Sequence, residues 1–422
     1  MISQTNNVTT NTLLVIGYVW PEPNSSAAGS HMLSLLKLFK SNGWRVIFAS
    51  PASKTEFMTD LMEFGIESVD IELNNQSFDL YINQLSPTAV MFDRFMMEEQ
   101  FGWRVAKHCP DAVRILDTED LQCLRQARHS ALKQERELVD ADFFSDVAKR
   151  EIAAIFRSDL SLIISDYEIK LLQERFQVPN NLLIHIPFMV SDHQIASNVS
   201  YGQRRHFVAI GNFRHAPNWD SVLYLKNLWP AIRQQLPDAE LHVYGAYTPP
   251  KATALHNTQD GFMIKDRANS AVEVVQSARV MLAPLRFGAG IKGKLLDAML
   301  TGTPSVTTPI GAEGMLGDCS ETCFWPGFVA DNDDDFVAAA VKLYQDQSYW
   351  NISSERCKPI LRNRYNAKTI GASLLDRVNQ ITNKTSLHRF SNFTGAMLQH
   401  HHHKSTQYMA QWIEAKNQLE SN

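Results

Sequence analysis

The sequence predicts an α/β protein with two Rossmann-like domains that face each other across a cleft. Short apolar runs alternate with segments of helical spacing along most of the chain, which is the pattern of parallel β-α units. A polar stretch without periodicity, Asp192–Gln203, interrupts this alternation. Beyond it, a glycine-rich loop stands between an apolar strand and a helix, as in ligand-binding units of such domains.

The length of the chain agrees with two domains. A chain of 422 residues is too long for a typical single core and suits two domains of about 150 to 200 residues each. We expect a first domain at residues 1–190, a second at residues 204–357, and a C-terminal helical segment with a tail at residues 358–422.

In the first half, short runs of apolar or β-branched residues predict the strands. They are Leu13–Ile16, Val46–Ala49, Val69–Ile71, Ala89–Phe92, Val113–Leu116, Leu162–Ile164 and Leu182–Ile186. The clearest helix between them covers His31–Phe39. Ser30 is suited to cap its N-terminus, and Asn42 with Gly43 is expected to end it.

The second half repeats the alternation. Its expected strands are Phe207–Ile210, Glu240–Tyr244, Val280–Ala283 and Ser305–Thr307. Helical spacing covers about Trp219–Gln235 and Asp335–Gln345. The acidic run Asp331–Asp335 favours the N-terminal end of the second of these helices. Helical spacing returns at Lys358–Val378 and, after a polar tail, at Thr406–Leu419.

The charge balance argues against nucleic acid as a partner. Lys and Arg number 40 and Asp and Glu number 45, so the net charge is −5, whereas a domain that binds phosphate backbones usually has a basic face. This balance leaves open a local basic patch for peripheral membrane association. The run Leu13–Ile16 is too short for a signal peptide or a membrane span, and no basic segment precedes it. We therefore expect an intracellular, cytoplasmic protein.

Two groups of residues have side chains that bind metals. Cys319 and Cys323 belong to a set of five cysteines, and a structural zinc site needs four protein ligands. The run His400–His403 has no carboxylate or cysteine frame beside it and is typical of solvated low-complexity sequence. We therefore expect reduced thiols and no metal centre.

The stretch Val280–Met315 has the features of an anion-binding β-α-β unit. Its apolar strand leads into a loop with Gly288 and Gly290, and a helix follows. The glycines permit close approach of the backbone, and the free N–H groups at a helix start suit a phosphate. Lys292 and Lys294 supply positive charge, although side chains two residues apart do not share a helix face. The alternative is a glycine loop that only turns the chain.

Other loops of the second half are expected to face the same cleft, because open α/β domains bind ligands at the carboxyl ends of their strands. These loops are residues 211–218 (GNFRHAPN) and the segment from Gly245 onward. Asp297, in the helix after the glycine loop, has two interpretations. It binds a sugar hydroxyl, or it complements the helix dipole.

Longer segments resemble a known family. They are Gly211-Asn212-Phe213 with PNWD, LWPAIRQQLPDAELHVYG, ARVMLAPLRFGAGIKGKLLDAMLTGTPSVTTPIGAEGM and, around Gly29, SAAGSHMLSLLKLFKSNGWRV. Together they resemble the retaining GT-B glycosyltransferases called glycosyl transferases group 1 (family 4-like), over nearly the whole chain and most strongly in its second half. The resemblance implies the GT-B fold, with C-terminal helices that return to the first domain.

The resemblance also implies a nucleotide-diphosphate sugar donor on the second domain, an acceptor on the first, and no metal or other cofactor. Arg214 with Lys292 or Lys294 would neutralise the diphosphate and stabilise the leaving nucleotide. Asp297 stands at the position of a ribose-binding glutamate. The other positions expected around the donor are Gly29, Gly211, Asn212, Gly245, Gly288, Ala289, Gly290 and Glu313.

The sequence departs from the family pattern at two places. Ala289 stands where many members have a sugar-contacting glutamate, and Glu313 is either a substitute carboxylate or a solvated turn residue. Members often carry a histidine after a first-domain strand, and the corresponding loops contain none. Carboxylates follow the strands there instead. Glu119 could act on an acceptor hydroxyl, while the adjacent Asp117 or Thr118 could cap a helix.

These observations predict a retaining glycosyltransferase that moves a sugar from a nucleotide-diphosphate donor to a glycan, lipid-linked or small-molecule acceptor. A carboxylate nucleophile, as in retaining glycosidases, is not required, because retaining GT-B enzymes are thought to use the leaving phosphate to help deprotonate the acceptor. The alternatives are a non-catalytic nucleotide-sugar binding module and a GT-B-fold nucleotide-sugar epimerase, since the fold alone does not fix the function.

Overall fold

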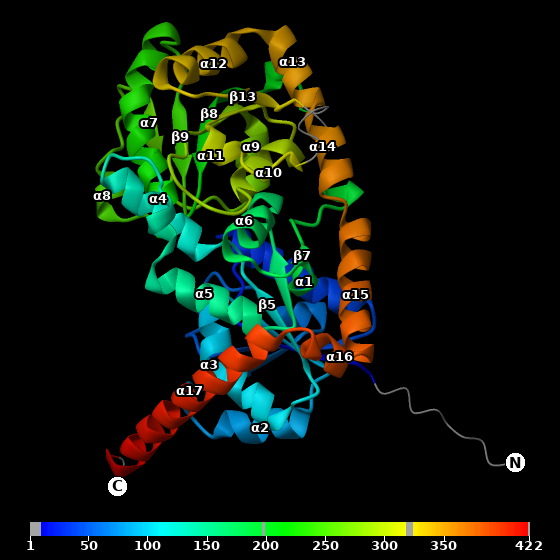
Figure 1. Ribbon diagram of the computed structural model, residues 1–422. Coiled ribbons are helices and arrows are strands. Elements are labelled where there is room, and N and C mark those ends of the chain that lie inside the picture. The colour runs from blue at the N-terminus through cyan, green and yellow to red at the C-terminus, as the bar shows by residue number, and fades with distance from the viewer. Residues whose placement is uncertain (1–9, 196–198, 318–323, 421–422) are drawn as a thin grey trace, which may run out of the picture.

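A computed structural model of the chain describes residues 10–195, 199–317 and 324–420. Two parallel sheets, each surrounded by helices, form two lobes that lie one above the other in Figure 1. The predicted pair of Rossmann-like domains is therefore confirmed as a fold. The exact domain limits stay a prediction, with the last strand of the first sheet ending at His185 and the first strand of the second beginning at Arg205.

The first sheet has seven strands in the order β3-β2-β1-β4-β5-β6-β7. Their bounds are β1 Thr12–Ile16, β2 Arg45–Ser50, β3 Glu67–Asp70, β4 Ala89–Asp93, β5 Val113–Asp117, β6 Leu160–Ile163 and β7 Leu183–His185. The helices that follow these strands are α1 Ala27–Ser41, α2 Ser77–Leu85, α3 Phe95–His108, α4 Gln122–Lys133, α5 Asp146–Arg157 and α6 Asp166–Phe176. Alternate side chains of β1 enter two different apolar cores, Leu14 on one face and Leu13 on the other, so both faces of the sheet are covered.

The second sheet has the order β10-β9-β8-β11-β12-β13. Its strands are β8 Arg205–Ile210, β9 Leu241–Tyr244, β10 Phe262–Ile264, β11 Ala278–Ala283, β12 Ser305–Thr307 and β13 Gly327–Val329. The associated helices are α7 Ala216–Gln235, α8 Pro250–Thr253, α9 Ala271–Ser277, α10 Gly293–Leu300, α11 Pro309–Ala312, α12 Asp333–Gln345, α13 Gln347–Glu355 and α14 Cys357–Arg364. The strand order reverses between β8 and β11, and ligands of open α/β sheets bind at such a switch point.

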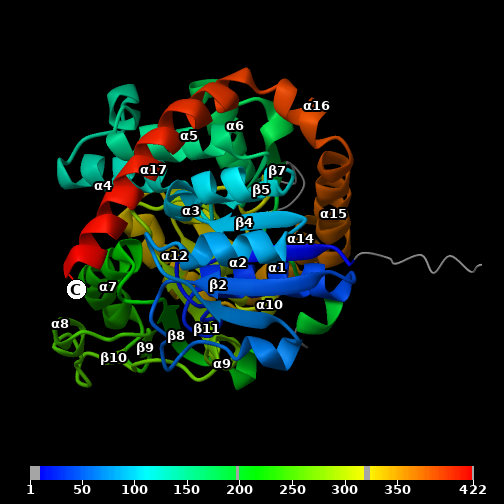
Figure 2. The same cartoon turned by 90° about the horizontal axis from the view of Figure 1, so that it is seen from below.

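Three C-terminal helices return to the first lobe, which confirms the predicted return. They are α15 Ala367–Asn383, α16 Thr385–Phe390 and α17 Phe393–Glu420. Figure 1 shows α15 descending along one side of the molecule, and Figures 1 and 2 show α17 lying across α3 and α5. Arg389 of α16 fixes this arrangement, since its guanidinium donates to the Asp159 carboxylate at 2.7 and 2.8 Å.

The chain passes between the lobes twice, and the two passages are hydrogen-bonded to each other. The Val190 N–H donates to the Tyr365 carbonyl oxygen at 2.7 Å, and the Ala367 N–H donates to the Val190 carbonyl oxygen at 3.0 Å. The connection between the lobes is therefore a pair of adjacent strands of chain. Because both crossings lie side by side, the two lobes can rotate relative to each other about this pair as a hinge, but they cannot move independently.

The start of α1 differs from the prediction. The helix begins at Ala27, because the Ser26 side chain accepts the Gly29 N–H at 3.1 Å and satisfies a free donor of the first turn. The expectation that Ser30 is the cap is therefore wrong, and Ser30 lies inside the helix on an exposed face. The predicted end is confirmed, since Asn42 is the C-terminal cap and Gly43 has a φ of 82°.

The remaining expectations concern the C-terminal half. The run His400–His403 lies within α17, whereas Cys319 and Cys323 lie outside the described residues. Asn332 caps α12, and the acidic residues Asp333–Asp335 form its first turn, as predicted. In the part of the chain that the structure describes, no helix is long and apolar enough to span a bilayer.

Candidate active site

The loops at the carboxyl ends of β8, β9 and β11 lie where the second lobe meets the first. The loop between β11 and α10, residues 284–292, is held by two first-lobe side chains. The Arg128 guanidinium of α4 donates to the Gly288 carbonyl oxygen at 2.8 Å, and the Gly290 N–H donates to Glu168 Oε1 of α6 at 2.9 Å. The predicted anion-binding loop is thus in direct contact with the opposite lobe.

Gly290 explains how the two backbones come so close. Its φ is 63°, a conformation that glycine adopts without steric cost. A Cβ added at this position would lie 3.0 Å from Asp120 Cβ and 3.1 Å from Ile164 Cγ2 of the first lobe. A side chain at Gly290 would therefore be strained and would push the lobes apart.

The two lysines after the glycine loop point to different neighbours. Lys292 Nζ donates to the Gly290 carbonyl oxygen at 2.7 Å, and Lys294 Nζ donates to Asn218 Oδ1 of α7 at 2.7 Å. Burial lowers the pKa of each ammonium group to about 8, in Lys292 against the raising effect of Glu313. An anionic ligand at this edge of the sheet would favour the charged form of both groups.

Asp297 lies in α10 one turn beyond Lys294 and is largely buried. Burial raises the pKa of its carboxyl group to about 7, because the charged form loses solvation there. The predicted role as helix-dipole partner is weak at this position, since the dipole acts mainly at the first turn. A carboxyl group kept out of water without a cationic partner is suited to a polar ligand such as a sugar hydroxyl.

The loops after β8 and β9 pack tightly against each other. A Cβ on Gly245 would lie 2.4 Å from the Gly211 carbonyl oxygen, and one on Gly211 would lie 2.6 Å from the Asn218 amide. The Asn212 side chain accepts the Arg214 N–H at 2.8 Å, which shapes the turn. Both predicted glycines are therefore required for backbone packing at this edge, whether or not they also contact a ligand.

Arg214 extends from this turn over an aromatic ring. Its guanidinium carbon is 3.6 Å from the centroid of Tyr247, a distance at which a cation is attracted to the ring face. The Tyr247 hydroxyl in turn donates to Glu22 Oε1 of the first lobe at 2.9 Å. The exposed guanidinium is thereby oriented at the boundary between the lobes.

Ala289 and Glu313 both contact the first lobe. Ala289 packs against the apolar core of that lobe, a place that a glutamate could occupy only at a large desolvation cost. Glu313 accepts two hydrogen bonds from the Arg128 guanidinium, at 2.8 and 2.6 Å. The interpretation of Glu313 as a solvated turn residue is therefore wrong, because its carboxylate is paired across the interface.

Gly29 serves a close backbone contact inside the first lobe. A Cβ at this position would lie 2.6 Å from the Glu22 backbone nitrogen, so the loop before α1 can fold onto the helix only if residue 29 is glycine. The start of α1 also touches the second lobe, because a Cβ on Gly293 would lie 2.5 Å from Ala27 Cβ. Gly29 therefore lets α1 begin at a place where its first residue contacts Gly293 at the start of α10.

The first lobe contains a buried group of ionisable residues near the boundary with the second lobe. Asp117 ends β5, Glu119 follows it with a φ of 61°, and His31 of α1 lies beside both. Burial is the main cause that raises the pKa of Asp117 to about 7 and raises the pKa of Glu119 well above its ordinary value. The Asp117 carboxyl group is therefore able to hold or accept a proton near neutral pH, and the shift of Glu119 favours its protonated form.

The capping interpretation of this region is wrong. The Asp117 side chain bonds to the Glu119 N–H at 3.3 Å, and Thr118 donates to the Leu162 carbonyl oxygen at 3.0 Å, so neither caps a helix. The N-terminus of α4 is instead satisfied from other helices, for example by Glu151, which accepts the N–H groups of Gln122 and Cys123. Carboxylates distant in sequence thus do the work expected of a local cap.

His31, Arg128 and Glu168 were not predicted as site residues. For His31 the reason is that only histidines in the loops after strands were considered. One signal was present for His31. It occupies a position on the apolar face of α1, next to Met32 and in line with Leu35, where a polar side chain needs a special reason to be buried. Arg128 and Glu168 gave no comparable signal, because their partners lie far away in the sequence.

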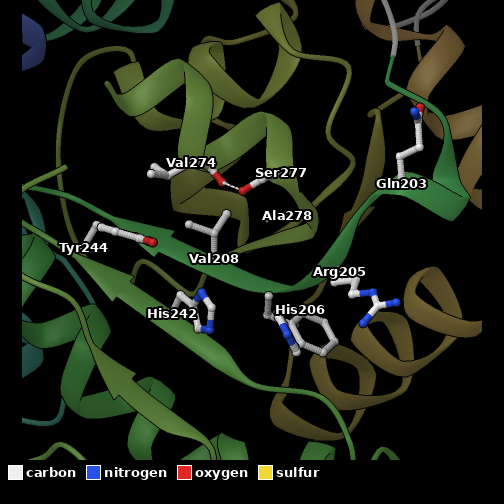
Figure 3. A pocket seen from close by; sticks show the side chains of 10 residues that line it. Gln203, Arg205, His206, Val208, His242, Tyr244, Val274, Ser277 and Ala278 are labelled. Atoms are coloured by element: carbon white, nitrogen blue, oxygen red, sulfur yellow. Dashed lines mark hydrogen bonds between the residues drawn. The ribbon is translucent and has the colours of Figure 1, made fainter. Parts of the chain in front are cut away.

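Two cavities adjoin the second sheet. The larger, of about 250 Å³, lies between α9, the first half of β8 and strand β9 (Figure 3). Its lining residues are Gln203, Arg205, His206, Phe207, Val208, His242, Tyr244, Val274, Ser277 and Ala278. The smaller, of about 10 Å³, lies at the carboxyl end of β8 beside Gly211, Asn218 and Lys294. The latter is too small for a nucleotide sugar, and its lining residues all belong to the second lobe.

Comparison with known proteins agrees with this geometry. Residues 204–346, which contain β8 to α12 and all three glycine loops, match the model of the family Glycosyl transferases group 1. This segment is a glycosyl transferases group 1 domain. No protein of curated function matches the sequence significantly.

Solved structures with low identity show the fold of the whole chain around this group 1 domain. Sucrose-phosphate synthase from Thermosynechococcus elongatus aligns with a TM-score of 0.64 at 11% identity, over 89% of this chain and 100% of that chain. HepE from Anabaena, in complex with UDP and glucose, gives 0.66 at 11%, over 88% and 100%. A mutant of TarM from S. aureus, in complex with fondaparinux, alpha-GlcNAc-glycerol and UDP, gives 0.56 at 12% over 71% of this chain. This chain spans 58% of that TarM chain. The chain has the GT-B fold, and its residues 204–346 belong to the group 1 glycosyl transferase family.

Proposed function

We propose that the protein transfers a hexose from a nucleotide-diphosphate donor to an acceptor hydroxyl with retention of anomeric configuration. The observation that carries this proposal is a set of three positively charged side chains at the carboxyl edge of the second sheet. Lys292 and Lys294 flank the start of α10, and Arg214 stands on the adjacent loop. A helix start with cations beside it is suited to a diphosphate.

In this proposal the three cations bind the donor and stabilise the charge that develops on the leaving nucleotide. Their preorganised positions supply the electrostatic stabilisation that the breaking glycosidic bond requires. Asp297 binds the ribose, and Glu313, oriented by Arg128, lies toward the donor sugar. The diphosphate charge is met by side chains, so the donor needs no metal.

The acceptor approaches from the first lobe. Glu119 is the proposed group that accepts or orients the acceptor proton, since it follows a strand of the first lobe and burial raises its pKa, which makes its ionised form a stronger base. Retention then follows if the acceptor attacks the face from which the nucleotide leaves. The proposal describes a cytoplasmic enzyme with a glycan, lipid-linked or small-molecule acceptor and leaves peripheral membrane contact open.

The first prediction concerns donor binding. UDP-sugars are the first donors to test, because the HepE and TarM complexes contain UDP. Lys292→Ala, Lys294→Ala and Arg214→Ala should each lower transfer by about 100-fold, since each removes a charge that stabilises the leaving group. The measurement is steady-state transfer with a UDP-sugar panel, together with donor binding by calorimetry. Lys342→Ala, on the exposed face of α12, is the matched control and should retain full activity.

The same assays separate the alternatives. Unchanged donor binding in all three variants would disprove the diphosphate assignment. A donor that binds without transfer or hydrolysis would favour the binding module, and a changed sugar configuration without an acceptor would favour the epimerase. The anomeric configuration of the product, read by NMR, tests retention directly.

A further inference from the structure

Three ligand-type side chains meet inside the first lobe, on the acceptor side of the interface. His31 Nδ1 is 3.8 Å from Asp117 Oδ2 and 3.9 Å from Glu119 Oε2. The exposed fractions of the three side chains are 1%, 1% and 8%. Two separate elements, α1 and the end of β5, therefore direct an imidazole and two carboxylates at one buried point.

The polar atoms at this point lack partners. Within residues 10–195, 199–317 and 324–420, both ring nitrogens of His31 and Oδ2 of Asp117 are buried and have no partner with good hydrogen-bond geometry, although the Ile186 backbone lies close enough to His31 to raise its pKa against the larger effect of burial. The separations of 3.8 and 3.9 Å are too long for hydrogen bonds. A buried polar atom without a well-formed hydrogen bond carries a desolvation cost, so the arrangement is unfavourable unless something binds between the three groups.

The local charge also points to a cation. After burial, Asp117, Asp93 and Asp120 raise the pKa of Glu119, and Arg94 opposes them. The nearest arginines are engaged with two of these neighbours, Arg94 at 3.6 Å from Asp93 and Arg125 at 3.3 Å from Asp120. Among the described residues, no arginine or lysine makes an ion pair with Asp117 or Glu119.

We propose that His31, Asp117 and Glu119 bind a divalent transition-metal cation. One imidazole nitrogen with two carboxylate oxygens suits ions such as Zn²⁺, Co²⁺ or Mn²⁺ better than Mg²⁺ or Ca²⁺, which prefer oxygen alone. Ligand atoms at about 2.1 Å from a tetrahedral ion lie roughly 3.4 Å apart, so an ion would draw the three groups together by a few tenths of an ångström.

A second cluster in the chain provides a contrast. His206, Glu240 and His242 also lie within a few ångströms of one another, beside the larger cavity in Figure 3. Their polar atoms already have partners, since His206 Nδ1 accepts the Glu240 N–H at 3.1 Å and His242 Nε2 bonds to Glu240 Oε2 at 2.7 Å. That cluster satisfies itself, whereas the cluster of His31 does not.

The position of the proposed ion gives it a place in the reaction chemistry. Asp120 lies under Gly290, and Ala27 at the start of α1 lies under Gly293. The cluster is therefore in the first lobe between two contacts with the donor-side loop. The ion is distinct from the donor diphosphate, which the lysines and Arg214 are proposed to bind. With the ion bound, Glu119 would be a metal ligand and would not act as the proton acceptor proposed above.

The second prediction tests this site by metal binding alone, so that its failure is separate from a failure of the proposed function. Co²⁺ is added to protein treated with a chelator, in a variant with His400–His403 replaced by alanine to remove that competing run. One equivalent should bind, with visible absorption bands of a protein-coordinated ion. Thermal unfolding should shift to higher temperature, because a ligand of the folded state stabilises it.

Two variants and one control decide the result. His31→Gln and Glu119→Gln should each weaken Co²⁺ binding by at least about tenfold, since each removes one of three ligands. The double variant His206→Gln with His242→Gln should retain the bound equivalent. Should His31→Gln fail to fold, the nearly isosteric Glu119→Gln decides alone. Absence of Co²⁺ binding, or stoichiometry and affinity unchanged in Glu119→Gln, would overturn the proposal and leave a cluster of protonated carboxyl groups.

Discussion

Several side chains around the donor-side loop lie in surroundings that disfavour their charges. Burial lowers the pKa of Lys292 and Lys294 to about 8 and raises the pKa of Asp297 to about 7. Each shift is a cost to the folded protein at neutral pH, because the unfolded chain would solvate the same charge freely. A ligand with complementary charges would favour the ionised side chains of the folded protein and would therefore raise its free energy of unfolding.

The third prediction follows for Asp297. Its pKa is raised from 3.8 to about 7, so its favourable contribution is complete below the unfolded value and is lost as the pH rises through about 7. Asp297→Asn has no group that ionises here, so its free energy of unfolding does not contain this loss. The difference in free energy of unfolding, variant minus natural protein, should therefore rise by at least about 1 kcal/mol between about pH 4 and pH 7. Above that range the difference should stay constant.

Urea denaturation across this pH range measures the difference. Asp238→Asn, in an exposed turn, is the matched control and should show no such trend. A stability difference between Asp297→Asn and the natural protein that does not vary with pH would contradict the assignment of a buried, largely protonated carboxyl group.

The success of sequence-based prediction at this scale depends on where the partner of a residue lies. Lys292, Lys294 and Asp297 were predicted because the glycine loop and helix that position them are contiguous in the sequence. Arg128 and Glu168 were not, because each meets the loop only after two lobes have folded and docked. Residues of one contiguous loop can be predicted from the sequence to lie together, whereas contacts between side chains from distant segments cannot.

At the scale of elements, the start of α1 shows how the choice of a helix cap depends on surroundings. The segment Ser25–Ser30 offers several serines, and each is suited to cap a helix. Ser26 is the cap because α1 already begins at Ala27. This early start requires glycine at position 29, since that residue packs closely on the Glu22 backbone. The sequence pattern favoured Ser30, since the apolar periodicity becomes clear only after it.

The fourth prediction uses this pair of serines. Ser26→Ala removes the acceptor for the Gly29 N–H and should lower the free energy of unfolding by about 1 kcal/mol. Ser30→Ala, at an exposed helical position, should change it by less than about 0.5 kcal/mol. Chemical denaturation of both variants provides the measurement, and equal effects would show that Ser26 is not the cap.

The strands differ in how well they could be predicted. The interior strands were located because continuous apolar runs mark strands that are buried on both faces. β10 and β13 at the edges of the second sheet escaped prediction, because each has three residues and too little periodicity to recognise. Neither edge strand contributes to the candidate site, so the functional interpretation did not suffer.

At the scale of the whole molecule, contacts between the lobes hold a closed arrangement. Arg128 pairs with Glu313, Arg364 of α14 donates to Asp166 of α6 at 2.7 Å, and the rings of His129 and Phe287 stack at 4.3 Å. The small cavity beside Lys294 is not closed by these contacts, since its lining residues all belong to the second lobe. The contacts between the lobes instead set the balance between the docked arrangement and any more open one.

The fifth prediction concerns this balance. Arg128→Ala breaks the paired contact and leaves the Glu313 carboxylate without a partner, so the open arrangement should gain population. We expect a larger radius of gyration in small-angle scattering without ligand and transfer activity lowered by at least about tenfold. Arg136→Ala breaks an exposed ion pair within the first lobe and should change neither property. An unchanged radius together with unchanged activity would show that Arg128 does not support closure.

Because the chain returns to the first lobe after Tyr365, that lobe is completed by the last part of the chain to be synthesised. The first sheet is complete at β7, but the helices α15 to α17 that cover part of it are translated last. Until they emerge from the ribosome, the apolar surface that later contacts Leu374 and Val378 of α15 is uncovered. The group 1 domain is therefore translated before the helices that complete its neighbour, and the first lobe is fully covered only when these last helices pack on it.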